Sequence, residues 1–180
     1  MNHVEQPRRV SRRGFLAGGA AAIVAVAVTG TTVLMDPSGA WAVELQSLKP
    51  EEAQALLKFV HDLFPHDQLA EVYYANAIAP LNDEAAKDPS AKRLLVDGIS
   101  RLNRLAQAAG GAAYADVSDE KIRVAAIKQL EGSPFFAKVY GTAVVSLYNQ
   151  PKLWPKFGYE GPSSPLGGYL HRGFSDIDWL

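Results

Sequence analysis

The 180-residue sequence contains no cysteine. This absence excludes disulfides, the Cys-x-x-Cys-His attachment of a c-type haem, cysteine-held iron–sulfur clusters and thiol catalysis. The sequence also has no excess of positive charge, because 18 Lys and Arg residues stand against 19 Asp and Glu residues. Nucleic-acid binding calls for a basic face, so this balance does not favour it.

Convincing strand alternation and internal repeats are missing as well. Apolar residues instead recur at helical spacing between Leu48 and Pro151. Helix starts are predicted where a capping residue or a first-turn proline precedes such a face, at Pro50, Asp67, Asp88-Pro89, Ser118 and Ser133-Pro134. Pro80 is expected to kink or end the second helix. We therefore predict an all-α body of about five helices in a compact bundle.

No catalytic constellation is evident, and the glycines near the C-terminus follow no strand of a dinucleotide-binding unit. The one group that resembles metal ligands is His61, Asp62, His66 and Asp67. Two histidines that share a zinc ion on a helix are four residues apart, whereas His61 and His66 are five apart with Pro65 between them. Capping explains Asp67 better, and a bond to backbone or to the tail explains His66 better. We predict no metal, no cofactor and no catalytic residue on this chain.

The N-terminal segment has the three parts of an export signal. A polar, arginine-bearing lead ends in Ser11-Arg12-Arg13-Gly14-Phe15-Leu16, and the run Leu16–Met35 that follows carries no charge. After a break, Ala40-Trp41-Ala42 places small residues at the −3 and −1 positions of a cleavage site. The arginine motif resembles the twin-arginine (Tat) signal Ser/Thr-Arg-Arg-x-Phe-Leu-Lys, with Ala17 in place of the lysine. Such a motif is an address read by a receptor, the Tat translocase, which moves proteins that have already folded.

Residues 1–42 are therefore predicted to be a removable signal peptide. The predicted Tat recognition residues are Ser11, Arg12, Arg13, Phe15 and Leu16, and the predicted cleavage residues are Ala40 and Ala42. The alternative is a retained anchor, because about 20 apolar residues can span a bilayer. Glycine and threonine dilute the run Leu16–Met35, which favours the cleaved signal.

The predicted helical domain covers residues 43–151, and a different kind of segment covers residues 152–180. The latter is rich in Gly and Pro, which argues against a continuous helix, and rich in aromatic residues, which argues against a disordered tail. It either packs on its own helical body or forms an arm that docks on a partner. The expected anchors of such an arm are Trp154, Tyr159, Tyr169, Phe174 and Trp179.

Several short motifs in the body and the tail resemble the gluconate 2-dehydrogenase subunit 3 family. They are Leu63-Phe64-Pro65-His66-Asp67, Tyr73, Tyr148-Asn149-Gln150-Pro151, Trp154, Gly158-Tyr159-Glu160-Gly161 and Gly167-Gly168-Tyr169. The resemblance covers roughly Pro50–Leu180, and the family's Tyr-Pro-Gly turn is Tyr159-Glu160-Gly161 here.

This resemblance implies a non-catalytic small subunit paired with a large GMC-type flavoprotein dehydrogenase, which binds FAD and oxidises a sugar or an alcohol. A cytochrome c subunit commonly completes such complexes. The small subunit escorts the folded flavoprotein through the Tat pathway to the periplasm, where the complex lies at the inner membrane. Two other functions stay open, a stand-alone periplasmic or membrane-anchored structural protein and an independent enzyme.

Overall fold

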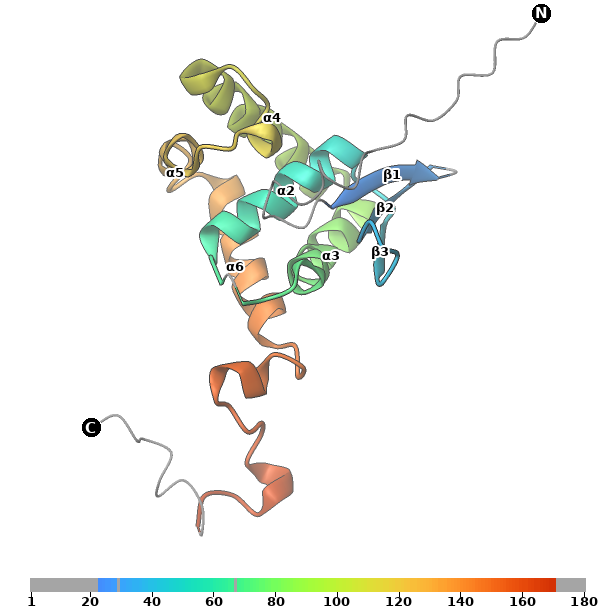
Figure 1. The fold of residues 1–180 in the computed structure, drawn as a ribbon, viewed down its shortest axis with the longest axis vertical. Helices are drawn as coiled ribbons and strands as arrows, with labels where there is room; N and C mark the ends of the chain where they lie inside the picture. Colours follow the sequence, from blue (N-terminus) through green and yellow to red (C-terminus); the bar gives the residue numbers. More distant parts are fainter. Residues whose placement is uncertain (1–22, 29, 67, 171–180) are drawn as a thin grey trace, which may run out of the picture.

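The computed structural model describes residues 23–28, 30–66 and 68–170. Five α-helices dominate these ranges (Figure 1): α2 Pro50–Leu63, α3 Glu71–Lys87, α4 Pro89–Gly110, α5 Glu120–Lys128 and α6 Pro134–Tyr148. Three short 3₁₀ helices accompany them: η1 Tyr114–Asp116, η2 Trp154–Phe157 and η3 Ser164–Leu166. The prediction of a mostly helical protein with about five helices is confirmed.

The prediction of an all-α protein is wrong, because three strands form an antiparallel sheet in the order β1-β2-β3. The strands are β1 Val24–Val28, β2 Thr31–Met35 and β3 Ala42–Leu45. Valine and threonine favour strands because their branched side chains pack well on a pleated surface. Gly30 and Gly39 lie in the connections and adopt φ of 87° and 75°, which glycine tolerates without strain. The described part of the predicted apolar run is therefore strand rather than helix, in β1 and β2.

Local signals set most helix boundaries as predicted. Asp88 caps α4 by accepting a hydrogen bond from the Ser90 amide, and Gly111 ends this helix in the left-handed conformation with φ of 90°. Ser133 caps α6 by accepting a hydrogen bond from the Phe136 amide at 3.2 Å. These starts and stops are confirmed.

Three boundary predictions need correction. Helix α3 begins at Glu71, and the expected cap Asp67 lies outside the described residues. This helix also runs through Pro80 to Lys87, so Pro80 does not end it. Pro80 is exposed, and so is Asn76 four residues earlier, so the carbonyl that loses its amide partner can bind water instead. Asp119 rather than its neighbour Ser118 caps α5, by accepting a hydrogen bond from the Lys121 amide at 2.8 Å.

The core lies where α2, α4 and α6 meet around the fully buried ring of Phe59. Its centroid is 5.4 Å from that of Phe135, 6.2 Å from that of Phe136 and 6.3 Å from that of Tyr114. A Cβ atom at Gly98 would lie 2.1 Å from the Phe135 ring. Glycine at this position therefore allows α4 and α6 to approach each other closely.

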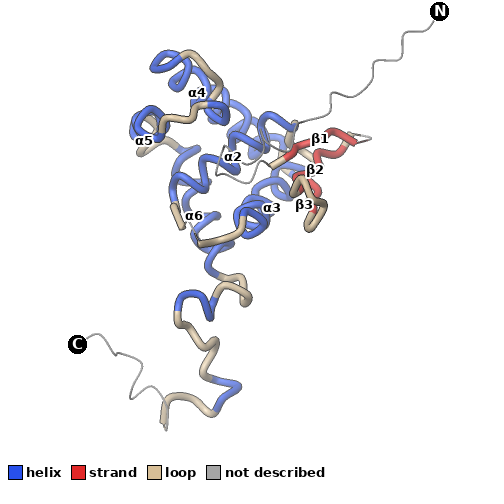
Figure 2. The backbone as a smooth tube through the Cα atoms, viewed as in Figure 1, coloured by secondary structure: helices blue, strands red, loops and turns tan. Residues whose placement is uncertain are grey.

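The sheet covers the side of the bundle formed by α2 and α3 (Figure 2). Leu34 of β2 and Leu45 of β3 are fully buried and join the same hydrophobic core as the helices. Thr32 is also buried, and its hydroxyl donates a hydrogen bond of 2.5 Å to the Leu48 carbonyl. Among the described residues, no helix is both long enough and apolar enough to cross a membrane.

Candidate partner interface

The segment after α6, residues 151–170, is called the arm here. Its base is tied to the helices. Leu153 is fully buried, the Gln150 side-chain amide donates a hydrogen bond of 2.8 Å to the Tyr73 carbonyl, and the Trp154 indole donates one of 3.0 Å to the Tyr148 carbonyl. These contacts fix the direction in which the arm leaves the body.

Trp154, an expected anchor, is half-buried by the arm itself. Its ring meets that of Tyr159 edge to face at 5.3 Å, and its carbonyl accepts a hydrogen bond of 2.9 Å from the Tyr159 amide. Gly161, with φ of 99°, lies beneath the indole, where an added Cβ would be 3.3 Å from the ring. Trp154 and Tyr159 therefore form one folded unit. A hollow of about 330 Å³ borders it, lined by Pro151, Trp154, Pro155, Gly158, Tyr159 and Glu160.

Beyond this unit the arm extends away from the helices (Figure 1). The aromatic side chains that it presents are well exposed, Tyr159 by 45% and Tyr169 by 55%. Leu170 is 77% exposed. The other two expected anchors, Phe174 and Trp179, lie outside the described residues. Residues 159–170 therefore do not wrap the helical body, and the Tyr159 and Tyr169 side chains stay about half exposed.

A row of rings that the sequence analysis missed runs from α6 to the arm, and we call it the aromatic ladder. Its members, in order of contact, are Phe136, Tyr140, Phe64, Tyr148, His66 and Phe157. Tyr140 stacks on both Phe136 and Phe64, with centroids 5.9 and 5.4 Å apart. Phe157 of η2 packs against His66 at 5.2 Å and Tyr148 at 5.5 Å.

Two members of the ladder reach the surface, Tyr140 with 45% and Phe157 with 40% exposure. Between these two rings, the Nε2 atom of His66 is hydrogen-bonded to the Tyr148 hydroxyl at 2.6 Å. Burial raises the pKa of Tyr148, and the nearby Tyr140 phenol adds to this shift. The ladder thus connects two exposed rings, Tyr140 and Phe157, through less exposed members, of which Phe64 is buried. The spacing of four between Phe136 and Tyr140 was the available signal in the sequence.

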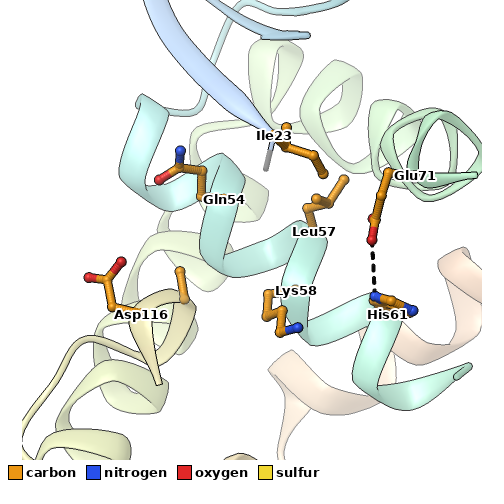
Figure 3. Close-up of a pocket in the computed structure, with 8 residues that line it drawn as sticks. Ile23, Gln54, Leu57, Lys58, His61, Glu71 and Asp116 are labelled. Carbon is orange, nitrogen blue, oxygen red and sulfur yellow. Dashed lines mark ion pairs between the residues drawn. The ribbon is translucent and has the colours of Figure 1, made fainter. Parts of the chain in front are cut away.

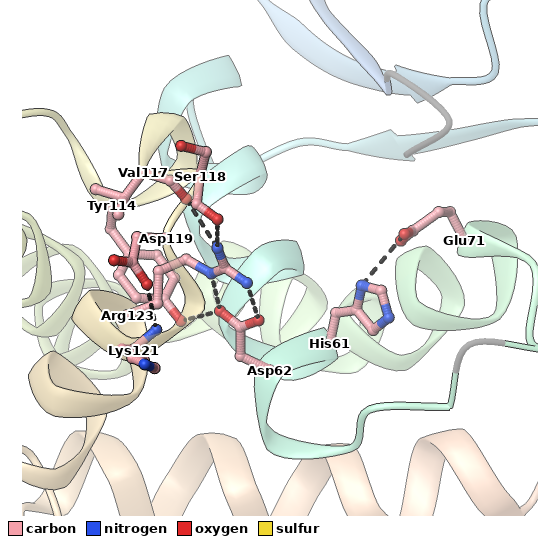
Figure 4. A network of polar contacts seen from close by, with 9 residues as sticks. All are labelled: His61, Asp62, Glu71, Tyr114, Val117, Ser118, Asp119, Lys121 and Arg123. Carbon is pink, nitrogen blue, oxygen red and sulfur yellow. Dashed lines mark hydrogen bonds and ion pairs between the residues drawn. The ribbon is translucent and has the colours of Figure 1, made fainter. Parts of the chain in front are cut away.

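The residues considered as metal ligands face different partners (Figure 4). The Nδ1 atom of His61 lies 3.3 Å from Oε1 of Glu71, whereas Asp62 pairs with Arg123. His66 belongs to the aromatic ladder, and Asp67 lies outside the described residues. Within residues 23–28, 30–66 and 68–170, no group of three or more His, Asp or Glu side chains is placed to hold a metal ion.

Asp62 is the centre of a buried polar network that links α2, η1 and α5. Arg123 donates to both of its oxygens, from Nε at 2.7 Å and from Nη2 at 3.0 Å, and the Tyr114 hydroxyl donates at 2.6 Å. The Nη1 atom of Arg123 donates to the carbonyls of Val117 and Ser118, each at 2.9 Å. Burial raises the pKa of Tyr114, and the hydrogen bond to Asp62 raises that of Arg123. Because these polar groups are hydrogen-bonded to one another and water has little access to them, the network stabilises the fold.

A hollow of about 240 Å³ lies beside α2, and the His61–Glu71 pair forms part of its wall (Figure 3). It is lined by Ile23, Gln54, Leu57, Lys58, His61, Glu71, Ala115 and Asp116. Oε2 of Glu71 is buried and has no hydrogen-bond partner among the described residues. The hollow combines apolar walls with both signs of charge.

The predicted export residues fall into two groups. Ser11, Arg12, Arg13, Phe15 and Leu16 lie outside the described residues. Ala40 lies in the connection before β3, and Ala42 is the first residue of β3. The sheet therefore spans the predicted division of the chain between residues 42 and 43.

Comparisons with known proteins returned no match among family models, curated proteins or solved structures.

Proposed function

We propose that this chain is a non-catalytic small subunit of an exported FAD-dependent dehydrogenase complex. In this proposal it escorts the folded flavoprotein through the Tat pathway and stabilises it in the periplasm, at the inner membrane. The FAD and the oxidation of a sugar or alcohol belong to a large GMC-type partner, and a cytochrome c subunit is a further candidate member. The kind of partner rests on the short motifs in the body and arm.

The observation that carries the proposal is the exposed, extended arm. Tyr159 and Tyr169 expose about half of their surface on a segment that leaves the helices. Tyrosine is favoured at the centres of protein interfaces because it buries a large ring and keeps a polar tip. The base of the arm is held by Leu153 and Trp154, so its course is set before a partner binds, which lowers the entropic cost of docking.

The docking role of the arm is tested with the double variant Tyr159→Ala/Tyr169→Ala. Each buried anchor lost should cost about 2 kcal/mol or more of binding free energy, roughly a thirtyfold weaker Kd. The matched control is Val145→Ala, because Val145 is 63% exposed but lies on α6. The control should bind the flavoprotein as tightly as the unaltered chain does. The double variant and the control should both unfold at the same midpoint as the unaltered chain. If the flavoprotein bound the double variant as tightly as the control, the arm would not be the docking element.

The escort role is tested with Arg12→Lys/Arg13→Lys, because the Tat receptor reads the arginine pair as an address. We expect the flavoprotein to stay in the cytoplasm together with this variant. The control is Arg8→Lys/Arg9→Lys, which alters two neighbouring arginines outside the motif. A flavoprotein exported equally well with either variant would show that this chain does not carry it.

A further inference from the structure

The peptide bond between Ala42 and Val43, the predicted cleavage point, lies inside the sheet of the folded chain. Ala42 is opposite Met35 and Val43 is opposite Leu34 in the antiparallel pairing of β2 with β3. Proteases bind their substrates as extended segments whose backbone groups are available for pairing. Cutting this bond therefore requires β3 to separate from β2, a local unfolding step.

The residues before the cleavage point also contribute to the core. Leu34 is fully buried, and Thr32 is 3% exposed and bonded to the Leu48 carbonyl. Ile23, the first described residue, packs against the core and lines the hollow beside α2 (Figure 3). Loss of β1 and β2 would uncover Leu45 and Leu48, which are 0% and 3% exposed in the intact fold. The helical body is therefore incomplete without the hairpin.

We infer that the folded chain is not processed at Ala40-Trp41-Ala42, and that the hairpin β1–β2 remains in the mature protein. Any processing boundary then lies before Ile23. The connection from β2 to β3, which contains Ala40 and Trp41, is itself ordered by hydrogen bonds from the Asp36 amide to the Trp41 carbonyl at 3.2 Å and from the Gly39 amide to the Asp36 carbonyl at 2.8 Å. This inference rests on the export part of the proposed function but not on the flavoprotein, so the two can fail separately.

The first test is the N-terminus of the exported full-length chain, read by intact mass and by peptide mapping. We expect peptides that contain Val24–Met35 in the purified periplasmic protein. A mature N-terminus at any residue after Ile23, Val43 above all, would overturn the inference. Absence of the flavoprotein from the same preparation would count against the proposed function alone.

The second test needs no export and uses the purified full-length chain with signal peptidase in detergent. Leu34→Asp and the milder Leu34→Ala loosen β2 from the core, whereas the control Val26→Asp alters a side chain that is 39% exposed on β1. Because cleavage follows the population of the open form, we expect at least a roughly tenfold faster cut at Ala42–Val43 in the Leu34 variants.

The control and the unaltered chain should be cut at least roughly tenfold more slowly under the same conditions. Heat-unfolded chain serves as the positive control for the protease, and circular dichroism checks that each variant keeps its helices. Equal cleavage of the unaltered chain and the Leu34→Ala variant would show that the sheet does not protect this bond.

Discussion

The buried pair of Asp62 and Arg123 offers a prediction whose size follows from the structure. The change is Asp62→Ala. It removes the acceptor of two bonds from Arg123 and of the bond from Tyr114, at 2.7, 3.0 and 2.6 Å. The side chains of the pair are each 8% exposed, so water has little access to the guanidinium that is left behind.

The expected loss of unfolding free energy is about 3–5 kcal/mol, the usual cost of leaving one charge of a buried pair uncompensated. Adding up the three lost charge-assisted hydrogen bonds, at about 1.5–3 kcal/mol each, would give a larger loss of unfolding free energy. However, Arg123 keeps its two bonds to the carbonyls of Val117 and Ser118, which limits the loss. Replacing both partners, as Asp62→Leu/Arg123→Met, should recover most of the stability because no buried charge remains.

The assay is urea unfolding followed by circular dichroism, with the variant Glu84→Ala as the control. Glu84 pairs with Lys138 at the surface, where their side chains are 44% and 33% exposed. Such pairs contribute about 0–1 kcal/mol, so this control should hardly change the unfolding free energy. A loss below about 1 kcal/mol for Asp62→Ala would refute the view of a buried network that stabilises the fold.

Three further predictions concern pH and packing. Since the pKa of Tyr114 is raised in the folded state, its contribution to stability is complete below the unfolded pKa of about 10 and is lost as pH rises above it. Above about pH 10 the unfolding free energy of the Tyr114→Phe variant should therefore fall less steeply with pH than that of the unaltered chain, by about 1.4 kcal/mol per pH unit, which unfolding curves at pH 9–11 would reveal. Gly98→Ala should destabilise by about 1–3 kcal/mol because its Cβ meets the Phe135 ring, whereas Gly141→Ala in open space on α6 should stabilise by about 0.5–1 kcal/mol. Leu34→Ala should cost about 2–5 kcal/mol in thermal or urea unfolding, and a near-zero value would place β2 outside the cooperative fold.

Several helix boundaries were predictable because they have a local chemical cause. Asp88, Ser133 and Gly111 act on backbone groups within a few residues, so the sequence alone reveals them. The sheet was not predictable by alternation, because both faces of Val24–Val28 carry only alanine and valine. Only its tertiary position decides that Leu34 faces the core.

The aromatic ladder and the Asp62 network could not be derived because their members come from distant parts of the chain. Tyr148 and His66 are separated by 82 positions, and Arg123 and Asp62 by 61. A charged residue on α5 usually faces water, and nothing near Arg123 in the sequence indicates that it is buried. The composition marked residues 152–180 as a separate segment rich in Gly, Pro and aromatic residues, but it left open whether they pack on the helices, and it did not indicate the pairing of Trp154 with Tyr159.

The central claim is that this chain carries a flavoprotein to the periplasm, and the most direct measurement is a purification. The tagged chain is isolated from the periplasm at native expression, and the product is examined by absorbance and mass spectrometry. The account predicts a flavin spectrum and a second, much larger polypeptide in fixed ratio to this chain. A colourless preparation of this chain alone would contradict the account and leave a structural protein or an independent enzyme as the functions to test.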